Sequence, residues 1–202
     1  MRNILSAAVV LFVLGSASAA LAHPHHGLPH SHLADGGLSA GLLHPLLGVD
    51  HLLAMLAVGV VAAWFTSHAR WFVPAGFVGG MLLGGVSAMA GLQVGLVEAG
   101  IALSLIVLGC GIAAGRKLPL LAVVLVMAAF GGMHGSAHGQ EVPSLASPLL
   151  YTLGFVVATI ALHLVGVGVG ALAQRNTTGV RSLQASGAAL AAFGVFLLVA
   201  GV

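Results

Sequence analysis

Residues 44–64 read HPLLGVDHLLAMLAVGVVAAW, in which two histidines and an aspartate precede a long run of apolar residues. A helix that crosses the hydrocarbon core of a bilayer needs about 20 consecutive, mostly apolar residues. Ionisable side chains inside such a helix are costly, and they usually face the bundle interior at a functional site. This stretch therefore predicts a membrane-spanning helix with a polar site near one of its ends.

The whole chain has the composition of an integral membrane protein. Of its 202 residues, 59% are apolar, 5% are charged and 30 are glycines. The mean hydropathy is +1.14. A chain of this composition lies mostly in lipid. We therefore expect an all-α integral membrane protein with one membrane domain and little room for a separate soluble domain.

The first 22 residues have the parts of a cleavable signal peptide. A basic start at Arg2 is followed by a short apolar core over residues 4–14 and by an Ala-Leu-Ala ending at residues 20–22. This order is typical of secretory signals. Cleavage after residue 22 would place the mature N-terminus outside the membrane, and an uncleaved seventh helix is the alternative.

Six further apolar segments follow, each long enough to cross the membrane. The expected spans are residues 42–65, 71–91, 95–114, 118–138, 148–173 and 182–202. The chain thus divides into a signal peptide, a His-rich N-terminal segment and a six-helix transmembrane bundle, over residues 1–22, 23–41 and 42–202.

The basic residues indicate how the bundle is oriented. With an outside start, the inner loops are expected at residues 66–70, 115–117 and 174–181. These loops hold every Lys and Arg after Arg2, namely Arg70, Arg116, Lys117, Arg175 and Arg181. This is the asymmetry of the positive-inside rule. We therefore expect both mature termini outside the membrane, which in a bacterium is the periplasm, and the basic charge reflects topology, not binding of nucleic acid.

The first span carries one candidate metal-binding motif. On a straight helix, Asp50 and His51 lie about 10 Å deeper than His44. His44, His51 and Met55 would then share one stripe of the helix. A seven-residue gap is long for two imidazoles that bind one ion, although Pro45 either starts the helix, with His44 as its cap, or kinks it there.

A second motif, MHGSAHGQE, occupies residues 133–141 at the outer end of the fourth span. His134 and His138 are four residues apart, a spacing at which two imidazoles on one helix face can bind one metal ion. Glu141 follows on the same face if the helix continues. Glu98, near the outer end of the third span, is a further candidate oxygen ligand. The topology thus brings both motifs to the same outer half of the bilayer.

Several other residues have weaker claims to a functional role. Met55 is more simply a core residue than a soft ligand. His163, deeper in the fifth span, is either a later step of a path or a buried polar group between helices. Cys110 is expected to be a small buried hydrophobic residue. Weak metal capture is expected of the N-terminal histidines, which are His23, His25, His26, His30 and His32.

The ligand types point to a divalent transition-metal ion. Imidazole and carboxylate without thiolate favour a divalent ion such as Ni²⁺, Co²⁺ or Zn²⁺ over Cu⁺. Besides transport of such an ion, these residues fit two other functions. One is a metal-binding accessory or sensor protein without transport, and the other is an intramembrane zinc-dependent hydrolase. Ser136, beside His138, leaves a serine hydrolase open as well. The sequence has no G-x-x-x-x-G-K-[ST] loop, so we do not expect it to hydrolyse ATP.

The two motifs resemble the signatures of a known family. HPLLGVDHLLAM, with its His-x5-Asp-His pattern, and HGSAHGQE look like those of the HupE/UreJ proteins, which are hydrogenase and urease accessory proteins. The resemblance extends over the signal peptide, the His-bearing N-terminus and all six spans. By matching positions, it implies that the metal ligands are His44, Asp50, His51, His134, His138 and Glu141.

The resemblance implies a nickel permease of the cytoplasmic membrane, without enzymatic activity, that supplies Ni²⁺ for hydrogenase or urease maturation. Its partners would be the metal ion, the lipid bilayer and, indirectly, the maturation proteins of nickel enzymes. Co²⁺ or Zn²⁺ as the transported ion and a homo-oligomeric state are left open. Met133 stands where this family often has an aromatic residue, and Glu98 matches neither motif.

Overall fold

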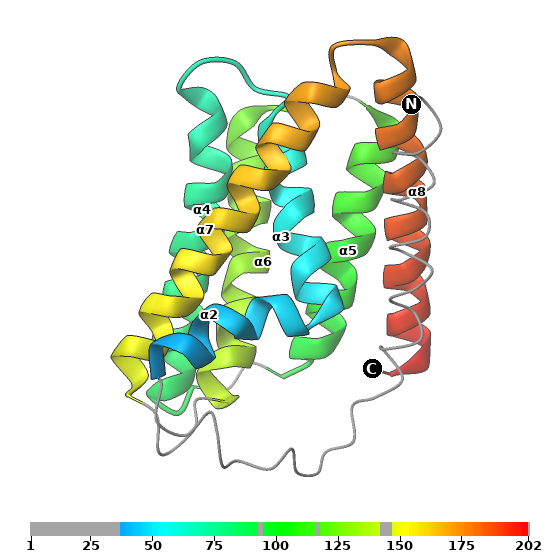
Figure 1. The fold of residues 1–202 in the computed structure, drawn as a ribbon. Coiled ribbons are helices and arrows are strands. Elements are labelled where there is room, and N and C mark those ends of the chain that lie inside the picture. The colour runs from blue at the N-terminus through cyan, green and yellow to red at the C-terminus, as the bar shows by residue number, and fades with distance from the viewer. Residues whose placement is uncertain (1–36, 93–94, 116–117, 142–146, 202) are drawn as a thin grey trace.

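The structure is a computed structural model that describes residues 37–92, 95–115, 118–141 and 147–201, with the side chains of residues 140 and 141 excepted. All regular structure in these residues is helical (Figure 1). The helices are α2 (Gly37–Leu47), α3 (Val49–Ala62), α4 (Ala69–Met89), α5 (Val97–Ala114), α6 (Leu120–Glu141), α7 (Pro148–Ala173) and α8 (Thr177–Ala200). The predicted signal peptide and the five N-terminal histidines lie outside the described residues.

Five of these helices, α4 to α8, are long and apolar enough to cross a membrane. The pair α2 and α3 meets the same test only when the two are taken together as one bent span, which brings the number to as many as six. The described part of the chain is therefore all-helical, with five or six candidate spans.

The prediction of one continuous first span over residues 42–65 is wrong. The chain bends by 82° between α2 and α3, and the break falls at Gly48, not at Pro45. Pro45 removes one backbone hydrogen bond but lies inside α2, which continues for two more residues. His44 consequently belongs to the last turn of α2 and does not cap the following helix. The shared stripe and the difference in depth predicted for a straight helix therefore do not apply.

The predicted bounds of the last span also need correction. We expected a loop over residues 174–181, but α8 begins at Thr177 and includes Arg181. The helix starts early because the side chain of Asn176 accepts a hydrogen bond of 2.8 Å from the backbone N–H of Gly179, which caps the first turn. By contrast, α7 spans residues 148–173 as predicted.

Glycines at a four-residue spacing bring the long helices into close contact. A Cβ atom at Gly80 would overlap the carbonyl oxygen of Ala128, and one at Gly84 would overlap that of Gly132. The backbones of α4 and α6 are therefore nearly in contact, and they run parallel, as two spans separated by one return crossing should. Gly166 of α7 packs on the backbone of α3 in the same way.

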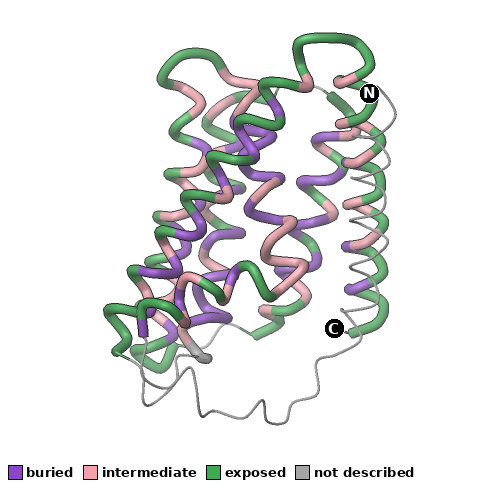
Figure 2. Tube along the Cα trace, viewed as in Figure 1, coloured by how far each residue is buried: buried purple, intermediate pink, exposed green. Residues whose placement is uncertain are grey.

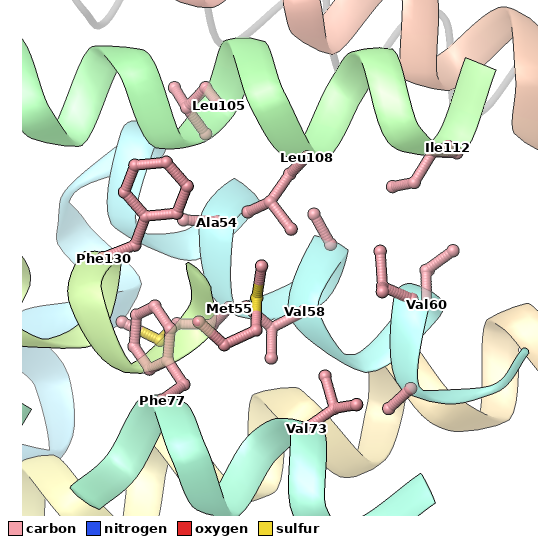
Figure 3. Close-up of a cluster of buried hydrophobic side chains, with 14 of the residues drawn as sticks. Ala54, Met55, Val58, Val60, Val73, Phe77, Leu105, Leu108, Ile112 and Phe130 are labelled. Atoms are coloured by element: carbon pink, nitrogen blue, oxygen red, sulfur yellow. The ribbon is translucent and has the colours of Figure 1, made fainter. Parts of the chain in front are cut away.

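Helix α3 lies in the middle of the bundle and supplies much of its buried surface (Figures 1 and 2). Figure 3 shows Met55 of α3 close to Phe77 of α4 in this core, and both side chains are fully buried. In Figure 1, α2 crosses the lower end of the bundle, where α6 ends and α7 begins. Cys110 of α5, expected to be buried, is exposed.

Candidate metal site

Four histidines from three helices meet at the end of the bundle that α2 crosses. The ring of His138 lies 4.6 Å from that of His44 and 4.6 Å from that of His51, between centroids. The ring of His134 lies 5.0 Å from that of His51. We call these four side chains the histidine cluster; His44 comes from α2, His51 from α3, and His134 and His138 from α6.

The bend at Gly48 is what joins the two sequence motifs. Helix α2 packs against α7, where a Cβ atom at Gly41 would overlap the carbonyl oxygen of Tyr151. This contact directs α2 across the bundle, and the ring of His44 contacts that of His138. A Cβ atom at Gly48 itself would lie 3.1 Å from both Asp50 Oδ1 and His51 Nδ1, so glycine also leaves room for this pair.

Asp50 orients His51 within the cluster. Its Oδ1 accepts a 2.9 Å hydrogen bond from the backbone N–H of His51 and lies 2.9 Å from His51 Nδ1. An ionised carboxylate can only accept, so Nδ1 carries the proton and the other ring nitrogen, Nε2, does not. A carboxylate behind a ligating imidazole fixes the ring and makes it a better ligand. In this arrangement, Asp50 acts as a positioning residue of the cluster.

We expect Asp50→Asn to weaken binding of Ni²⁺ by about 10- to 100-fold, because an amide fixes the tautomer of His51 less well than a carboxylate does. Isothermal titration of the purified protein in detergent measures this effect. Asp50→Glu, which keeps the charge on a longer stem, should lose less affinity than Asp50→Asn. Equal affinity of Asp50→Asn and the unaltered protein would contradict the positioning role.

His134 is also oriented for binding a cation. The carbonyl oxygen of Phe130, one turn earlier on α6, accepts a 2.9 Å hydrogen bond from His134 Nδ1. Nε2 is therefore the unprotonated nitrogen; it is buried and has no hydrogen-bond partner among the described residues. A buried acceptor without a partner is destabilising. A cation at this point would remove that cost.

The other predicted site residues lie in different places. Glu141 is the last residue of α6, so the helix continues as far as this motif requires, but its side chain is outside the described set. Glu98 is exposed in the first turn of α5. Met55 and His163 are buried in the core, at 0% and 2% exposure. Ser136 is fully buried in α6.

The histidine cluster does not form a closed metal cage. Among the described side chains, no group of three or more His, Cys, Asp or Glu residues is arranged to hold an ion. The imidazoles instead pack edge-to-face or tilted against one another.

Aromatic side chains surround the cluster, and the sequence analysis missed them. Phe155 lies 4.2 Å from His138, and Tyr151 lies 5.8 Å from His44, between ring centroids. Phe77 lies 5.2 Å from His134. Tyr151 is the only tyrosine of the chain, and this rarity was the one feature of the sequence that distinguished it. The phenylalanines could not be distinguished from the apolar residues around them.

A half-open hollow of about 50 Å³ lies between α4, α6 and α7, bordered by His138, Met81 and Phe155 among other residues. This is room for more than one water molecule. The hollow gives His138 a neighbouring space that is not filled by side chains.

Two comparisons with known proteins indicate the same family. The sequence model described as "HupE / UreJ protein" matches residues 11–197. The chain is also similar to "Protein HupE" of Rhizobium leguminosarum bv. viciae, with 39% identity over 179 residues that cover 89% of this chain and 91% of that protein. No solved structure matches the chain.

Proposed function

Because the chain belongs to the HupE/UreJ family, we propose that it is a nickel permease of the bacterial cytoplasmic membrane. In this proposal the transported ion is Ni²⁺, with Co²⁺ or Zn²⁺ as competitors, and the ion serves the maturation of hydrogenase or urease. The observation that carries the proposal is the histidine cluster, in which imidazoles of α2, α3 and α6 are in ring contact inside an apolar helix bundle.

The chemistry of the cluster supports a divalent transition metal. Four imidazoles with a carboxylate behind one of them suit Ni²⁺, Co²⁺ and Zn²⁺, whereas Mg²⁺ and Ca²⁺ prefer oxygen ligands. Placing such polar groups in the apolar interior is costly, so they are expected to serve a site or a path. The lack of a closed cage among the described side chains fits a transport site, since conduction requires binding weak enough for release.

The topology suggests how the ion enters. We assign the end with the histidine cluster to the periplasm, because the basic residues expected in the inner loops lie toward the opposite ends of the spans. The N-terminal histidines and the carboxylates of Glu98 and Glu141 would collect hydrated ions on this side. The ion would then exchange water for His44 and His138 before it reaches His51 and His134.

Uptake by sealed liposomes that contain the purified protein tests the proposal. We expect Ni²⁺ to accumulate inside the liposomes, and Co²⁺ and Zn²⁺ to compete with it. The initial rate of uptake should fall at least about tenfold in His51→Ala, because this variant lacks both the imidazole and its contact with Asp50. His68→Ala is the matched control: His68 is an exposed histidine at the start of α4, and its loss should leave uptake unchanged.

One result would contradict the permease function, and another would contradict the role of the histidine cluster. Ni²⁺ that binds to the protein but never enters the liposomes would favour an accessory or sensor protein. Equal loss of uptake in His51→Ala and His68→Ala would mean that the histidine cluster has no special role. Both results are compared with metal binding by the protein in detergent, which measures occupancy of the site independently of transport.

A further inference from the structure

His163 of α7 is a buried histidine that the histidine cluster does not include. It is 2% exposed, and neither of its ring nitrogens has a hydrogen-bond partner among the described residues. It lies more than halfway along α7 from Pro148, the end that packs near α2. Buried polar groups are nearly always satisfied, so one that is not calls for an ion or a water molecule.

One aromatic ring contacts both His163 and the histidine cluster. Phe77 of α4 is 5.4 Å from the ring of His163, edge to face at 88°. The same phenylalanine ring is 5.2 Å from that of His134. Phe77 therefore contacts both His163 and one member of the cluster, His134.

Two further donors accompany His163 in the interface between α4 and α7. Thr159 lies one helical turn before His163 on α7 and is fully buried, and its hydroxyl is 4.0 Å from the sulfur of Met81. Met81 lies one turn after Phe77 on α4 and borders the hollow next to His138. The interface thus gathers an imidazole, a thioether and a hydroxyl, a mixed set that suits a borderline divalent ion such as Ni²⁺ or Co²⁺.

We propose that His163 is the nitrogen ligand of a second, inner transit site for a divalent transition-metal ion, next to the thioether of Met81 and the hydroxyl of Thr159. Phe77 contacts both this inner site and the histidine cluster. The proposal rests on the permease function in one respect, namely that the ion arrives from the cluster. Two weak sites in series would let one ion leave the first as it binds the second.

Cobalt spectroscopy on an engineered cysteine tests whether a metal reaches this position. Cys110→Ala removes the exposed thiol of α5 and provides the background. In this background we expect His163→Cys to give a near-ultraviolet thiolate-to-Co²⁺ charge-transfer band when Co²⁺ is added, because a thiolate binds Co²⁺ directly. Val165→Cys is the matched control: Val165 is 54% exposed on the same helix and should give no band.

The charge-transfer band tests whether a metal ion binds at the inner site, independently of the rate of transport. Its absence in His163→Cys, while equilibrium dialysis shows Co²⁺ bound at the histidine cluster, would overturn the proposal. If the unaltered protein takes up no metal but the band is present, the permease function fails and the inner site stands as a binding site.

A separate uptake measurement tests whether the inner site lies on the path. We expect His163→Ala to bind Ni²⁺ at the histidine cluster with affinity within about twofold of the unaltered protein, while its uptake falls at least about tenfold. His163→Met, which restores a soft ligand, should recover part of the uptake. Uptake by His163→Ala at the rate of the unaltered protein would overturn the assignment of the inner site to the transport path.

Discussion

The His138→Ala variant should lose Ni²⁺ uptake almost completely, by about 100-fold or more, because in the proposed function His138 is a direct ligand, and removing a direct ligand costs more than the 10- to 100-fold typical of an outer-shell partner. The ring of His138 is 4.6 Å from those of both His44 and His51, so it connects the α2 part of the cluster to the α3 part. Without it, the remaining imidazoles no longer form a continuous group. Initial rates of uptake into liposomes measure the effect.

His138→Cys separates the loss of a ligand from the loss of packing. The ring of His138 also packs on Phe155, at 4.2 Å between centroids, so alanine leaves both a missing ligand and a small void. Cysteine leaves a similar void but keeps a metal-binding atom. We expect His138→Cys to retain measurable metal binding with a preference shifted toward softer ions. If His138→Cys and His138→Ala were equally inactive and equally unstable to heating, the effect would be one of packing.

The second large effect concerns stability. We expect Gly80→Ala to destabilise the bundle by about 2 to 3 kcal/mol, as overpacking of a tight core does. A Cβ atom at this position would overlap the carbonyl oxygen of Ala128, which is backbone and cannot rotate away. The helices α4 and α6 would have to separate, and His134 and His138 of α6 would shift with respect to Phe77.

The neighbouring glycine provides the control. Gly79 is on the same helix, and a Cβ atom there would meet nothing within 4 Å. Gly79→Ala should therefore change the unfolding free energy by no more than about 0.5 kcal/mol. Reversible unfolding in mixed micelles, followed by circular dichroism, compares the two variants. Similar stabilities for Gly79→Ala and Gly80→Ala would show that the close approach of α4 and α6 does not stabilise the fold.

Much of the fold follows from local sequence properties. Apolar segments of spanning length are local features, and the predicted bounds of α7 agree with the observed ones. The spacing of Gly80 and Gly84 indicates a helix face that admits a close neighbour, and this neighbour is α6. Asn176 is a common N-cap residue, so the sequence also contained a signal for the start of α8. The polar residues that follow Asn176 nevertheless led us to predict a loop there.

The bend in the first span was harder to predict. Proline is the usual signal for a kink, and Pro45 drew attention to the wrong residue. The observed break at Gly48 depends on α2 packing on α7, which begins a hundred residues later in the chain. No periodicity within residues 42–65 reports such a contact.

The apolar helices of this protein and its two motifs of imidazole and carboxylate groups can be identified from the order of residues alone. Which of the imidazoles meet depends on the tertiary structure. The bend at Gly48 brings His44 to His138, and the packing of α4 against α7 puts Phe77 next to His163. The physical reason is that hydropathy and charge act residue by residue along the chain, whereas ring contacts depend on how whole helices bend and pack.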